Sequence, residues 1–257
     1  MGRIIAIANQ KGGVGKTTTA INLAACLAEK GKKVLAVDMD SQGNFTSGFG
    51  IDKDNLDYNI YDVLTGECNI GEAMLVNIMS NLNMIPASQD LAGAEVDFID
   101  VDKPQYILKK IIRPIRKQFD FIIIDCPPAL GMLTVNAMTA ADTVIVPIQC
   151  EFYALEGLSQ LISTIKKIRK KLNKNLEIEG VVFTMFDSRN NLSGEVVEAV
   201  RDSLDEIIYD TIVPRNVRLA EAPSFGLPIT LYDTRSSGAE AYRSLADEVI
   251  KNKLFAD

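Results

Sequence analysis

Short apolar runs alternate with amphipathic segments from one end of the chain to the other. The apolar runs are nearly continuous, which is typical of strands buried on both faces of a sheet. They lie at residues 3–8, 33–38, 82–87, 119–125, 143–147, 179–185 and 207–213. Apolar residues at helical spacing fill the gaps, notably at 19–30, 105–117, 132–140, 154–172, 193–204 and 238–253. This alternation predicts an α/β fold, a doubly wound, mostly parallel sheet flanked by helices on both faces.

The length and composition fit one globular unit. The 257 residues suffice to bury a core, and no repeat, low-complexity tract or linker divides them. We therefore expect residues 1–257 to form a single domain. No apolar run reaches the ~18–20 residues of a membrane span. The chain enters its first strand at residue 3, which leaves no room for a signal peptide, so we expect a cytoplasmic protein.

The cysteines and the missing histidines limit the chemistry. Cys26, Cys68, Cys126 and Cys150 are scattered and show no metal-binding spacing. Reduced thiols of a cytosolic protein explain them most simply. Because the chain has no histidine, histidine-based acid–base chemistry and histidine metal sites are excluded.

The loop between the first strand and the first helix carries the most specific motif. It reads Gln10-Lys11-Gly12-Gly13-Val14-Gly15-Lys16-Thr17-Thr18. Glycines let the backbone approach an anion, and the N–H groups of the loop and of the helix N-terminus point at bound phosphates. In such a P-loop Lys16 reaches the β- and γ-phosphates and the Thr17 hydroxyl binds Mg²⁺. One departure from the common pattern is Gln10 where glycine is usual, with a second lysine, Lys11, at the front of the loop.

Phosphoryl transfer also needs a metal holder and a group that orients the attacking water. Both are expected at the carboxyl ends of parallel strands, where a doubly wound sheet binds ligands. Asp125 ends the apolar run 121–124, which is the Walker B arrangement, and is predicted to hold Mg²⁺ through water. An acidic helix cap is the alternative for Asp125, but Pro127 and Pro128 supply no backbone donor. The segment 38–44, with Asp38 and Asp40, follows the second strand and is the other candidate.

The motif at the front of the chain is similar to the deviant Walker A sequence of the ParA/MinD class of ATPases. Segment 38–44 resembles switch I of that class, with Ser41 where proline is usual, and segment 125–128 resembles switch II. Residues 149–157 and 213–224 resemble further signature blocks of chromosomal ParA proteins of the Soj type. The resemblance covers the full length of the chain.

The resemblance implies roles for individual residues. Lys11 reaches across a homodimer interface to the partner's nucleotide in the ATP state, and Lys16 acts with it in catalysis. Asp40 positions the water that attacks the γ-phosphate, while Asp38 supports the metal shell with Thr17 and Asp125. The adenine is bordered by Pro214, Asn216 and Met185. ATP and Mg²⁺ are the implied cofactors.

The acidity of the chain argues against a nucleic-acid partner when taken alone, since the net charge is −7 and the pI is near 4.9. Binding depends on local patches, however. Arg189 and Arg215 follow two late strands, Arg218 lies just beyond, and a lysine-rich run spans 166–174. The resemblance places DNA-binding arginines at Arg189 and Arg218, and Arg215 lies in the same loop as Arg218. The alternative for the arginines is that they are ordinary solvated surface residues. The alternative for the lysine-rich run is that it lies at a helix C-terminus and complements the helix dipole.

Three functions compete at this point. In the first, an ATP-bound dimer grips double-stranded DNA without sequence preference and is released when a ParB/Spo0J-like partner stimulates hydrolysis. The second is a MinD-like ATPase that binds membrane to position the division site. The third is a reductase like the nitrogenase iron protein, which needs two well-placed cysteines, and Cys126 has no convincing partner for that role.

The C-terminal segment and the position of the P-loop favour the first function. Residues 246–257 contain Leu254 and Phe255, but also three acidic residues and only two lysines, so anionic lipid would gain little. We therefore expect no membrane binding and a nucleoid-associated protein. Because the P-loop begins at residue 10, we also expect no N-terminal helix-turn-helix domain.

Overall fold

A single eight-stranded sheet runs through the part of the chain that the computed structural model describes, residues 2–151, 154–204 and 207–252. The strand order is β3-β4-β2-β5-β1-β6-β7-β8. Every described pairing is parallel except that of β3 with β4. The strands are β1 (Arg3–Ile7), β2 (Val34–Asp38), β3 (Leu75–Met79), β4 (Leu82–Ile85), β5 (Phe121–Asp125), β6 (Thr143–Gln149), β7 (Glu177–Phe186) and β8 (Ile208–Pro214).

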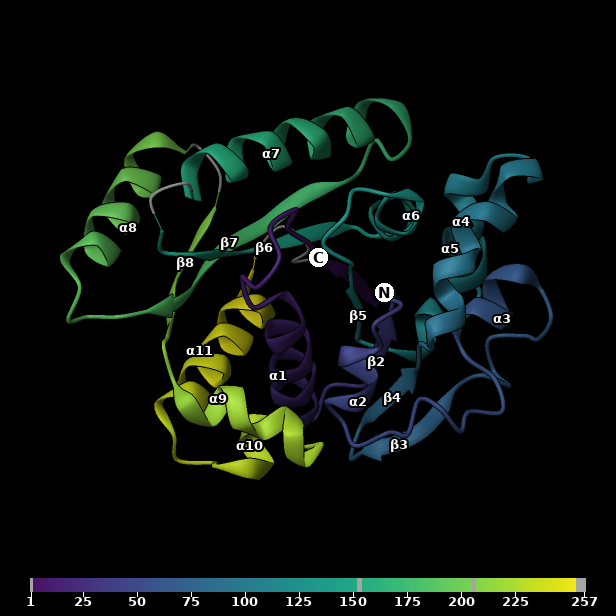
Figure 1. The fold of residues 1–257 in the computed structure, drawn as a ribbon, viewed down its shortest axis with the longest axis horizontal. Helices are drawn as coiled ribbons and strands as arrows, with labels where there is room; N and C mark the ends of the chain where they lie inside the picture. Colours follow the sequence, from purple (N-terminus) through teal and green to yellow (C-terminus); the bar gives the residue numbers. More distant parts are fainter. Residues whose placement is uncertain (1, 152–153, 205–206, 253–257) are drawn as a thin grey trace.

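Helices cover both faces of the sheet (Figure 1). On one face α1 (Lys16–Glu29) packs against α11 (Ser237–Lys251). The other face is covered by α5 (Ile107–Ile112), α6 (Met132–Ala140), α7 (Ala154–Lys171) and α8 (Asn191–Ser203). Shorter helices complete the fold: α2 (Asn44–Ser47), α3 (Ile60–Thr65), α4 (Ala94–Asp97), α9 (Val217–Glu221) and α10 (Ile229–Tyr232). The predicted doubly wound, mostly parallel architecture is confirmed.

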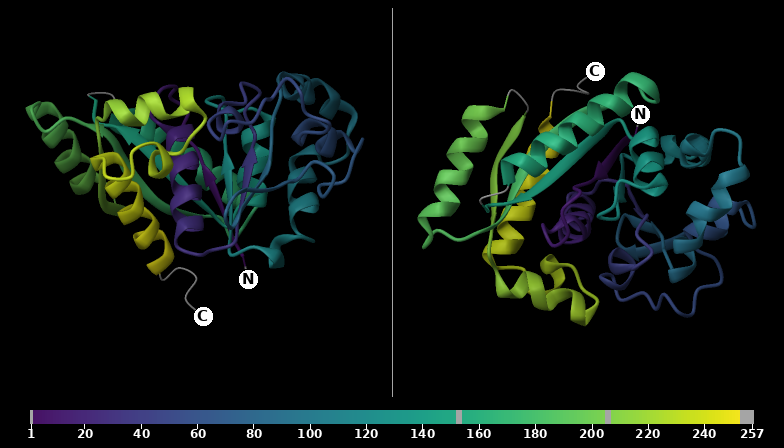
Figure 2. Two further views of the ribbon diagram at one scale, coloured as in Figure 1. Left: turned by 90° about the horizontal axis from the view of Figure 1, so that it is seen from below. Right: turned by 45° about the horizontal axis from the view of Figure 1, so that its top comes forward.

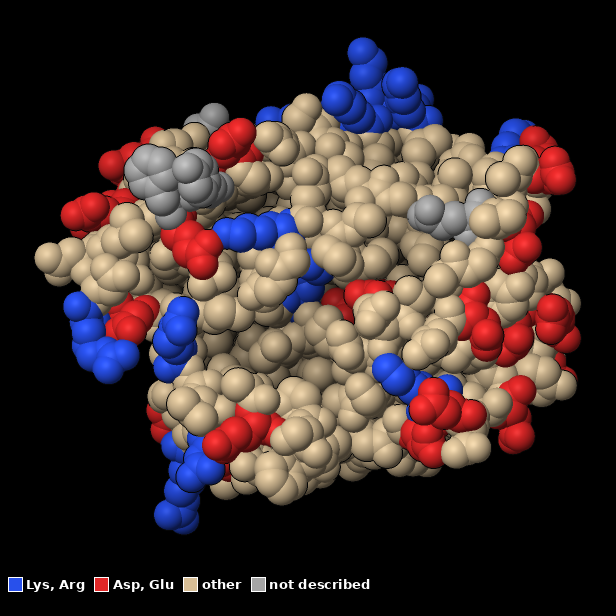
Figure 3. Space-filling view, in the orientation of Figure 1, with Lys and Arg blue, Asp and Glu red and all other residues tan. Residues whose placement is uncertain are grey.

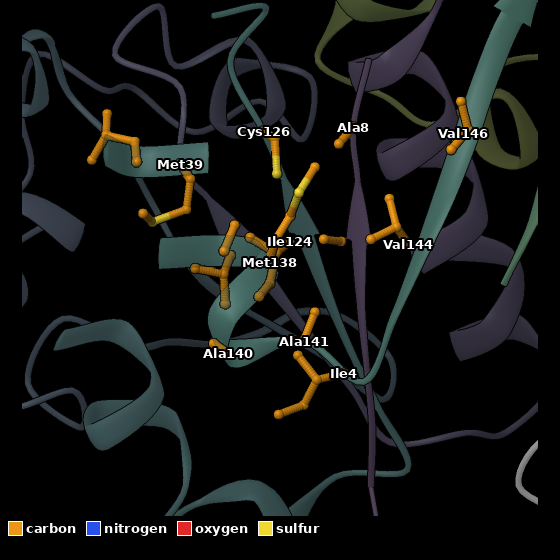
Figure 4. Packing of buried hydrophobic residues seen from close by; sticks show 14 of the residues in the cluster. Ile4, Ala8, Met39, Ile124, Cys126, Met138, Ala140, Ala141, Val144 and Val146 are labelled. Carbon is orange, nitrogen blue, oxygen red and sulfur yellow. The ribbon is translucent and has the colours of Figure 1, made fainter. Parts of the chain in front are cut away.

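The core follows from the alternation of side chains along the central strands. On β1, Ile4 and Ala6 point to one hydrophobic cluster, while Ile5 and Ile7 point to the other, and all four are at most 3% exposed. Figure 4 shows the first cluster, where labelled side chains of β1, β5 and β6 meet Met138 of α6. A strand buried on both faces must be apolar at every position, which is the pattern of its sequence.

The sheet brings three distant loops to one edge. β1 lies between β5 and β6, and β2 pairs with β5 on its other side, with Asp38 opposite Asp125. Because these strands are parallel, the loops that follow β1, β2 and β5 all leave at their carboxyl ends. The left view of Figure 2 shows this edge at the top and the N-terminus at the opposite end of the strands.

Several elements differ from the predicted ones. The helix expected at 105–117 is helical as α5 only over Ile107–Ile112, because Pro114 lacks the N–H that a longer helix needs. The edge strand β3 and the short helices between 44 and 97 were not predicted, because their sequences show no clear pattern of apolar residues. The helix expected to reach 253 ends at Lys251, and Leu254 and Phe255 lie outside the described residues.

Candidate nucleotide-binding site

The loop after β1 is held open by glycines and anchored by its neighbours. Gly13 and Gly15 have φ of 75° and 83°, the left-handed region that glycine adopts without strain. Gly15 is the N-cap of α1, so the free N–H groups of the first helical turn face the loop. The Thr184 hydroxyl of β7 donates to the carbonyl of Val14 at 2.8 Å, and Lys11 N–H donates to the Asn9 side chain at 3.0 Å. The loop is therefore fixed from both sides before any ligand binds.

Lys16 is placed where its charge is unfavourable without an anion. It lies in the first turn of α1, where the helix dipole disfavours a cation, and the residue is only 7% exposed. Burial lowers the pKa of its ammonium, although the nearby Asp125 carboxylate opposes this. Its Nζ donates to the carbonyl of Lys11 at 3.0 Å, across the mouth of the loop. Phosphate oxygens would supply the negative charge that stabilises the Lys16 ammonium.

Two adjoining cavities flank the loop, and Figure 3 shows the face above them as hollowed at its centre. The first, of about 350 Å³, is lined by Gly12, Gly13, Gly15, Lys16, Thr17, Thr18, Asp40, Gln42, Asn44, Pro128 and Met185. The second, of about 320 Å³, is mostly apolar and is lined by Gly15, Thr18, Thr184, Met185, Val213, Pro214, Arg215, Asn216, Val217, Leu219, Ala220 and Tyr242. Their polar and apolar linings fit the phosphates and the base of a nucleotide, respectively.

Met185 separates the two cavities in a strained conformation. It lines both of them and has a φ of 52°, which is uncommon for a residue with a side chain. The pairing of β7 with β8 shifts register between Phe183 and Phe186, so Met185 sits in a bulge. Strain of this kind concentrates at functional sites. Of the residues predicted to border the base, Met185, Pro214 and Asn216 are all brought to the second cavity.

Asp125 lies behind the phosphate cavity with its charge unsatisfied. It is fully buried, and neither carboxylate oxygen accepts a hydrogen bond of normal geometry from the described residues. Burial raises the pKa of Asp125 well above its usual value, and the neighbouring Asp38 raises it further, while the facing Thr17 hydroxyl lowers it by less. A buried carboxylate without a partner fits a magnesium ion or its water ligands.

Asp38 is engaged differently from Asp125, although both were predicted at the metal. The Thr46 N–H and hydroxyl donate to one oxygen at 2.9 and 2.7 Å, and Asp40 N–H donates to the other at 3.1 Å. Thr46 in turn accepts from Ala87 N–H at 2.9 Å. Asp38 thus organises the loop after β2, whereas Asp125 presents free oxygens to a cation. The Thr46 contacts had no signal in the sequence.

The loop that carries Asp40 is ordered by Asp40 itself. Its carbonyl accepts from Gly43 N–H at 2.9 Å, and its side chain accepts from Gln42 N–H at 3.0 Å. Lys53 donates to the carbonyl of Gln42 from the following loop. Ser41 therefore lies in a turn that is stabilised by hydrogen bonds of other residues. Proline is usual at this position in the family that the segment resembles.

We expect the buried carboxylates to make the metal-free protein less stable as the pH rises. Burial raises the pKa of Asp38 from 3.8 to about 6 and that of Asp125 well above 3.8. At these two residues the folded protein therefore binds more protons than the unfolded chain between pH 4 and 6, so their contribution to the free energy of unfolding falls with rising pH. For Asp38 the shift corresponds to roughly 3 kcal/mol.

With Asp125→Asn, the free energy of unfolding of the metal-free protein should fall less steeply as the pH rises. At pH 7 the variant should be more stable than the wild type by about 1–3 kcal/mol, because the uncompensated charge is removed. Urea denaturation in EDTA from pH 4 to 8 measures both effects, with the exposed Asp54→Asn as the control. Magnesium and nucleotide together should stabilise the wild type more than the variant. A variant that is less stable than the wild type at pH 7 would show that Asp125 supports the fold instead.

Lys11 and Gly12 lie at the outer rim of the loop. The Lys11 ammonium forms an ion pair with Glu151, and both side chains are 45% exposed. Lys11 does not line either cavity, and Val14 is buried beneath the loop. A Cβ added to Gly12 would meet no atom within 4 Å. No described atom of this chain therefore excludes a side chain at this position, although Gly12 also lines the phosphate cavity.

The three arginines predicted to bind DNA lie near one edge of the sheet. β7 and β8 are neighbours, so the loops that follow them leave side by side. Arg189 pairs with Asp187 at 2.8 Å and Arg218 with Glu221 at 2.9 Å, while Arg215 lines the apolar cavity. The Arg189 guanidinium lowers the pKa of Asp187 to about 2. Exposed ion pairs of this kind are weak, so another anion can compete for these arginines.

The site and the fold define a P-loop nucleotide-binding protein, since the glycine loop joins a buried strand to a helix N-terminus beside a strand-end aspartate. The family described as an AAA domain matches residues 2–178. The sporulation initiation inhibitor protein Soj of Bacillus subtilis is 52% identical over 98% of this chain and 100% of its own length. The chromosome partitioning protein ParA of Myxococcus xanthus is 52% identical over 98% of this chain and 89% of its own. The chain belongs to the Soj/ParA family of chromosome-partitioning ATPases.

Solved structures agree with this assignment of the fold. Cobyrinic acid a,c-diamide synthase from Mycobacterium smegmatis, with bound ADP and magnesium, has a TM-score of 0.86 and 37% identity, covering 98% of this chain and 95% of that one. The cell division ATPase MinD from Pyrococcus furiosus has a TM-score of 0.82 and 30% identity, covering 98% and 99%. Among the helices that the structure describes, none is both long and apolar enough to cross a membrane.

Proposed function

We propose that this protein is a magnesium-dependent ATPase of DNA segregation, whose ATP-bound dimer holds DNA and releases it after hydrolysis. The observation that carries the proposal is the buried, unpartnered Asp125 behind a preformed phosphate cradle, in a chain of the Soj/ParA family. The solved relatives with bound ADP or ATP analogue and magnesium support the choice of cofactors. We further propose that residues 1–257 act as one domain.

The residues around the cradle divide the chemistry among them. Lys16 and the N–H groups of the first turn of α1 bind phosphate oxygens, and magnesium, when bound, would neutralise charge on the phosphates. Thr17 and Asp125 are placed to hold that ion, with Asp38 fixing the loop beside it. In the described part of the chain no group of three or more acidic or cysteine side chains is arranged to hold a metal ion by itself, so phosphate oxygens and water would complete the shell. Asp40 orients the attacking water.

The distribution of charge supports DNA as the ligand. Residues 51–103 contain eleven acidic residues and two lysines, a net charge of −9, whereas the whole chain carries −7. Outside this segment the protein is therefore slightly basic. In Figure 3 acidic side chains dominate the side of α3–α5, and basic ones gather over α7. Arg189, Arg215 and Arg218 lie outside the acidic segment and are proposed to bind phosphates without reading sequence.

We also propose that a ParB/Spo0J-like protein stimulates hydrolysis and so ends the DNA-bound state, which would make the protein nucleoid-associated. Weak hydrolysis alone and faster hydrolysis with the partner are the expected kinetics. Random duplex DNA and anionic vesicles should be compared, each with ATP and with ADP. Binding to DNA only with ATP supports the proposal, and binding to vesicles without DNA binding would favour a MinD-like function.

Arg218→Glu is expected to weaken ATP-dependent DNA binding by about tenfold or more and to reduce the salt dependence of binding, because a phosphate contact is replaced by repulsion in both subunits. Fluorescence anisotropy with a random duplex at several salt concentrations measures both changes. Lys117→Glu is the matched control, because Lys117 is exposed at the opposite end of the sheet, before β5. If Arg218→Glu binds DNA as well as the control does, the basic surface lies elsewhere.

A further inference from the structure

Three apolar side chains are exposed between residues 96 and 101, from α4 into the turn that follows it. Val96 is 68% exposed, Ile99 75% and Val101 41%. Val96 and Ile99 are three positions apart in consecutive helical turns, so they share one side. Phe98, in the same turns, is buried in the core. The segment therefore has an inner apolar face that packs and an outer one that contacts solvent. We call residues 96–102 the outer turn.

Acidic residues alternate with these apolar ones. Asp97, Asp100 and Asp102 are exposed within the outer turn. The turn also ends the segment 51–103, which carries a net charge of −9. Contiguous exposed apolar groups mark interaction sites, and charged neighbours select which partner can approach them.

The charge decides among the possible occupants. DNA and anionic lipid carry the same sign as this surface and are repelled. A second copy meeting the turn through a twofold axis would place the same aspartates opposite each other. We propose that the outer turn is a docking surface for a segment of a partner protein in which Lys or Arg residues border an apolar face. This inference concerns a surface away from the nucleotide, and it stands whether or not the protein binds DNA.

A defined peptide tests the proposal directly. The probe is a labelled peptide of about 20 residues with Leu on one helical face and Lys on the other. One control peptide has the same composition in an order that mixes Leu and Lys, and a second has Glu in place of Lys. Fluorescence anisotropy gives the affinity of the full-length protein for each, and the segregated basic peptide should bind at least tenfold more tightly than both controls. Equal binding of the mixed peptide would overturn the proposal, because general charge attraction would then suffice.

Variants of the protein locate the surface. Val96→Ser combined with Ile99→Ser should weaken binding of the probe by about tenfold, since both side chains are truncated at the contact. Asp100→Asn with Asp102→Asn should weaken binding and flatten its salt dependence. The matched control is Val76→Ser with Leu231→Ser, whose side chains are 66% and 57% exposed on β3 and α10.

The outcomes separate this proposal from its alternatives. It is overturned if the Val96/Ile99 variant binds the probe within twofold of the wild type, or if the control variant loses as much affinity. Sedimentation velocity without peptide provides a further test, because a Val96/Ile99 variant that self-associates less than the wild type would assign the surface to a second copy. All four substituted positions of the two apolar variants are exposed, so loss of fold is not expected. DNA binding and ATP hydrolysis, measured on the same proteins, report the proposed function separately.

Discussion

Asp40→Asn is expected to slow ATP hydrolysis by about 10²- to 10⁴-fold while leaving nucleotide binding within a few-fold of the wild type. The Asp40 side chain lines the phosphate cavity, and Gln42 N–H donates to one of its oxygens at 3.0 Å. Asparagine can accept the same hydrogen bond through its amide oxygen, so the turn from Asp40 to Gly43 should keep its shape. What is lost is the carboxylate oxygen that would orient and polarise a water molecule.

Single-turnover release of phosphate with magnesium and ATP measures the chemical step, and equilibrium binding of a labelled ATP analogue measures the site. Asp54→Asn is the matched control, because Asp54 lies exposed in the loop beyond α2. This substitution removes the same charge from a nearby part of the chain. Hydrolysis by Asp40→Asn at more than a tenth of the wild-type rate would assign the water to another group. A large loss of nucleotide affinity would mean that Asp40 shapes the pocket.

The sequence predicted the parts of the site that are local in the chain. The strand, glycine loop and helix from Arg3 to Glu29 form one continuous pattern, and the structure has them at the expected places. Asp125 was recognisable because it ends an apolar run, and buried parallel strands place their last residues at the ligand edge. The other buried strands were predicted from the same alternation, but their order across the sheet was not.

The contacts that tune the site join residues far apart in the chain, so no local pattern contains them. Thr46 connects Asp38 to Ala87, 41 residues further on. Glu151 holds Lys11 from 140 residues away. The half-exposed edge strand β3 also escaped prediction, since its side chains lack the continuous apolar run of a buried strand. The strained backbone of Met185 depends on a shift in pairing between β7 and β8, which only the assembled sheet defines.

Gly12→Ala is expected to leave the folded monomer intact and to prevent the ATP-dependent dimer. The added methyl group would meet no atom of its own chain within 4 Å, and φ at Gly12 is not in the left-handed region. A second subunit approaching the rim of the loop would meet it, however. An extra methyl in a close-packed contact costs about 1–3 kcal/mol. Twofold symmetry places two of them in the interface, so the dimer should weaken by roughly 30- to 10⁴-fold.

Sedimentation velocity with ATP and magnesium measures this best in proteins that also carry Asp40→Asn, so that slow hydrolysis preserves the ATP state. Gly194→Ala is the matched control, because a Cβ at Gly194 of α8 also meets no atom within 4 Å. Binding of ADP should be alike in both variants and the wild type, and neither variant should unfold at a lower temperature than the wild type, since alanine at Gly194 of α8 favours the helix. A dimer that forms equally well in Gly12→Ala would remove the rim of the loop from the interface, and with it the proposed reach of Lys11 into the partner's nucleotide. Because Gly12 also lines the phosphate cavity, binding of a labelled ATP analogue is measured as well. Loss of the dimer in Gly12→Ala alone, with binding of the analogue unchanged, would place the loop at the contact between subunits.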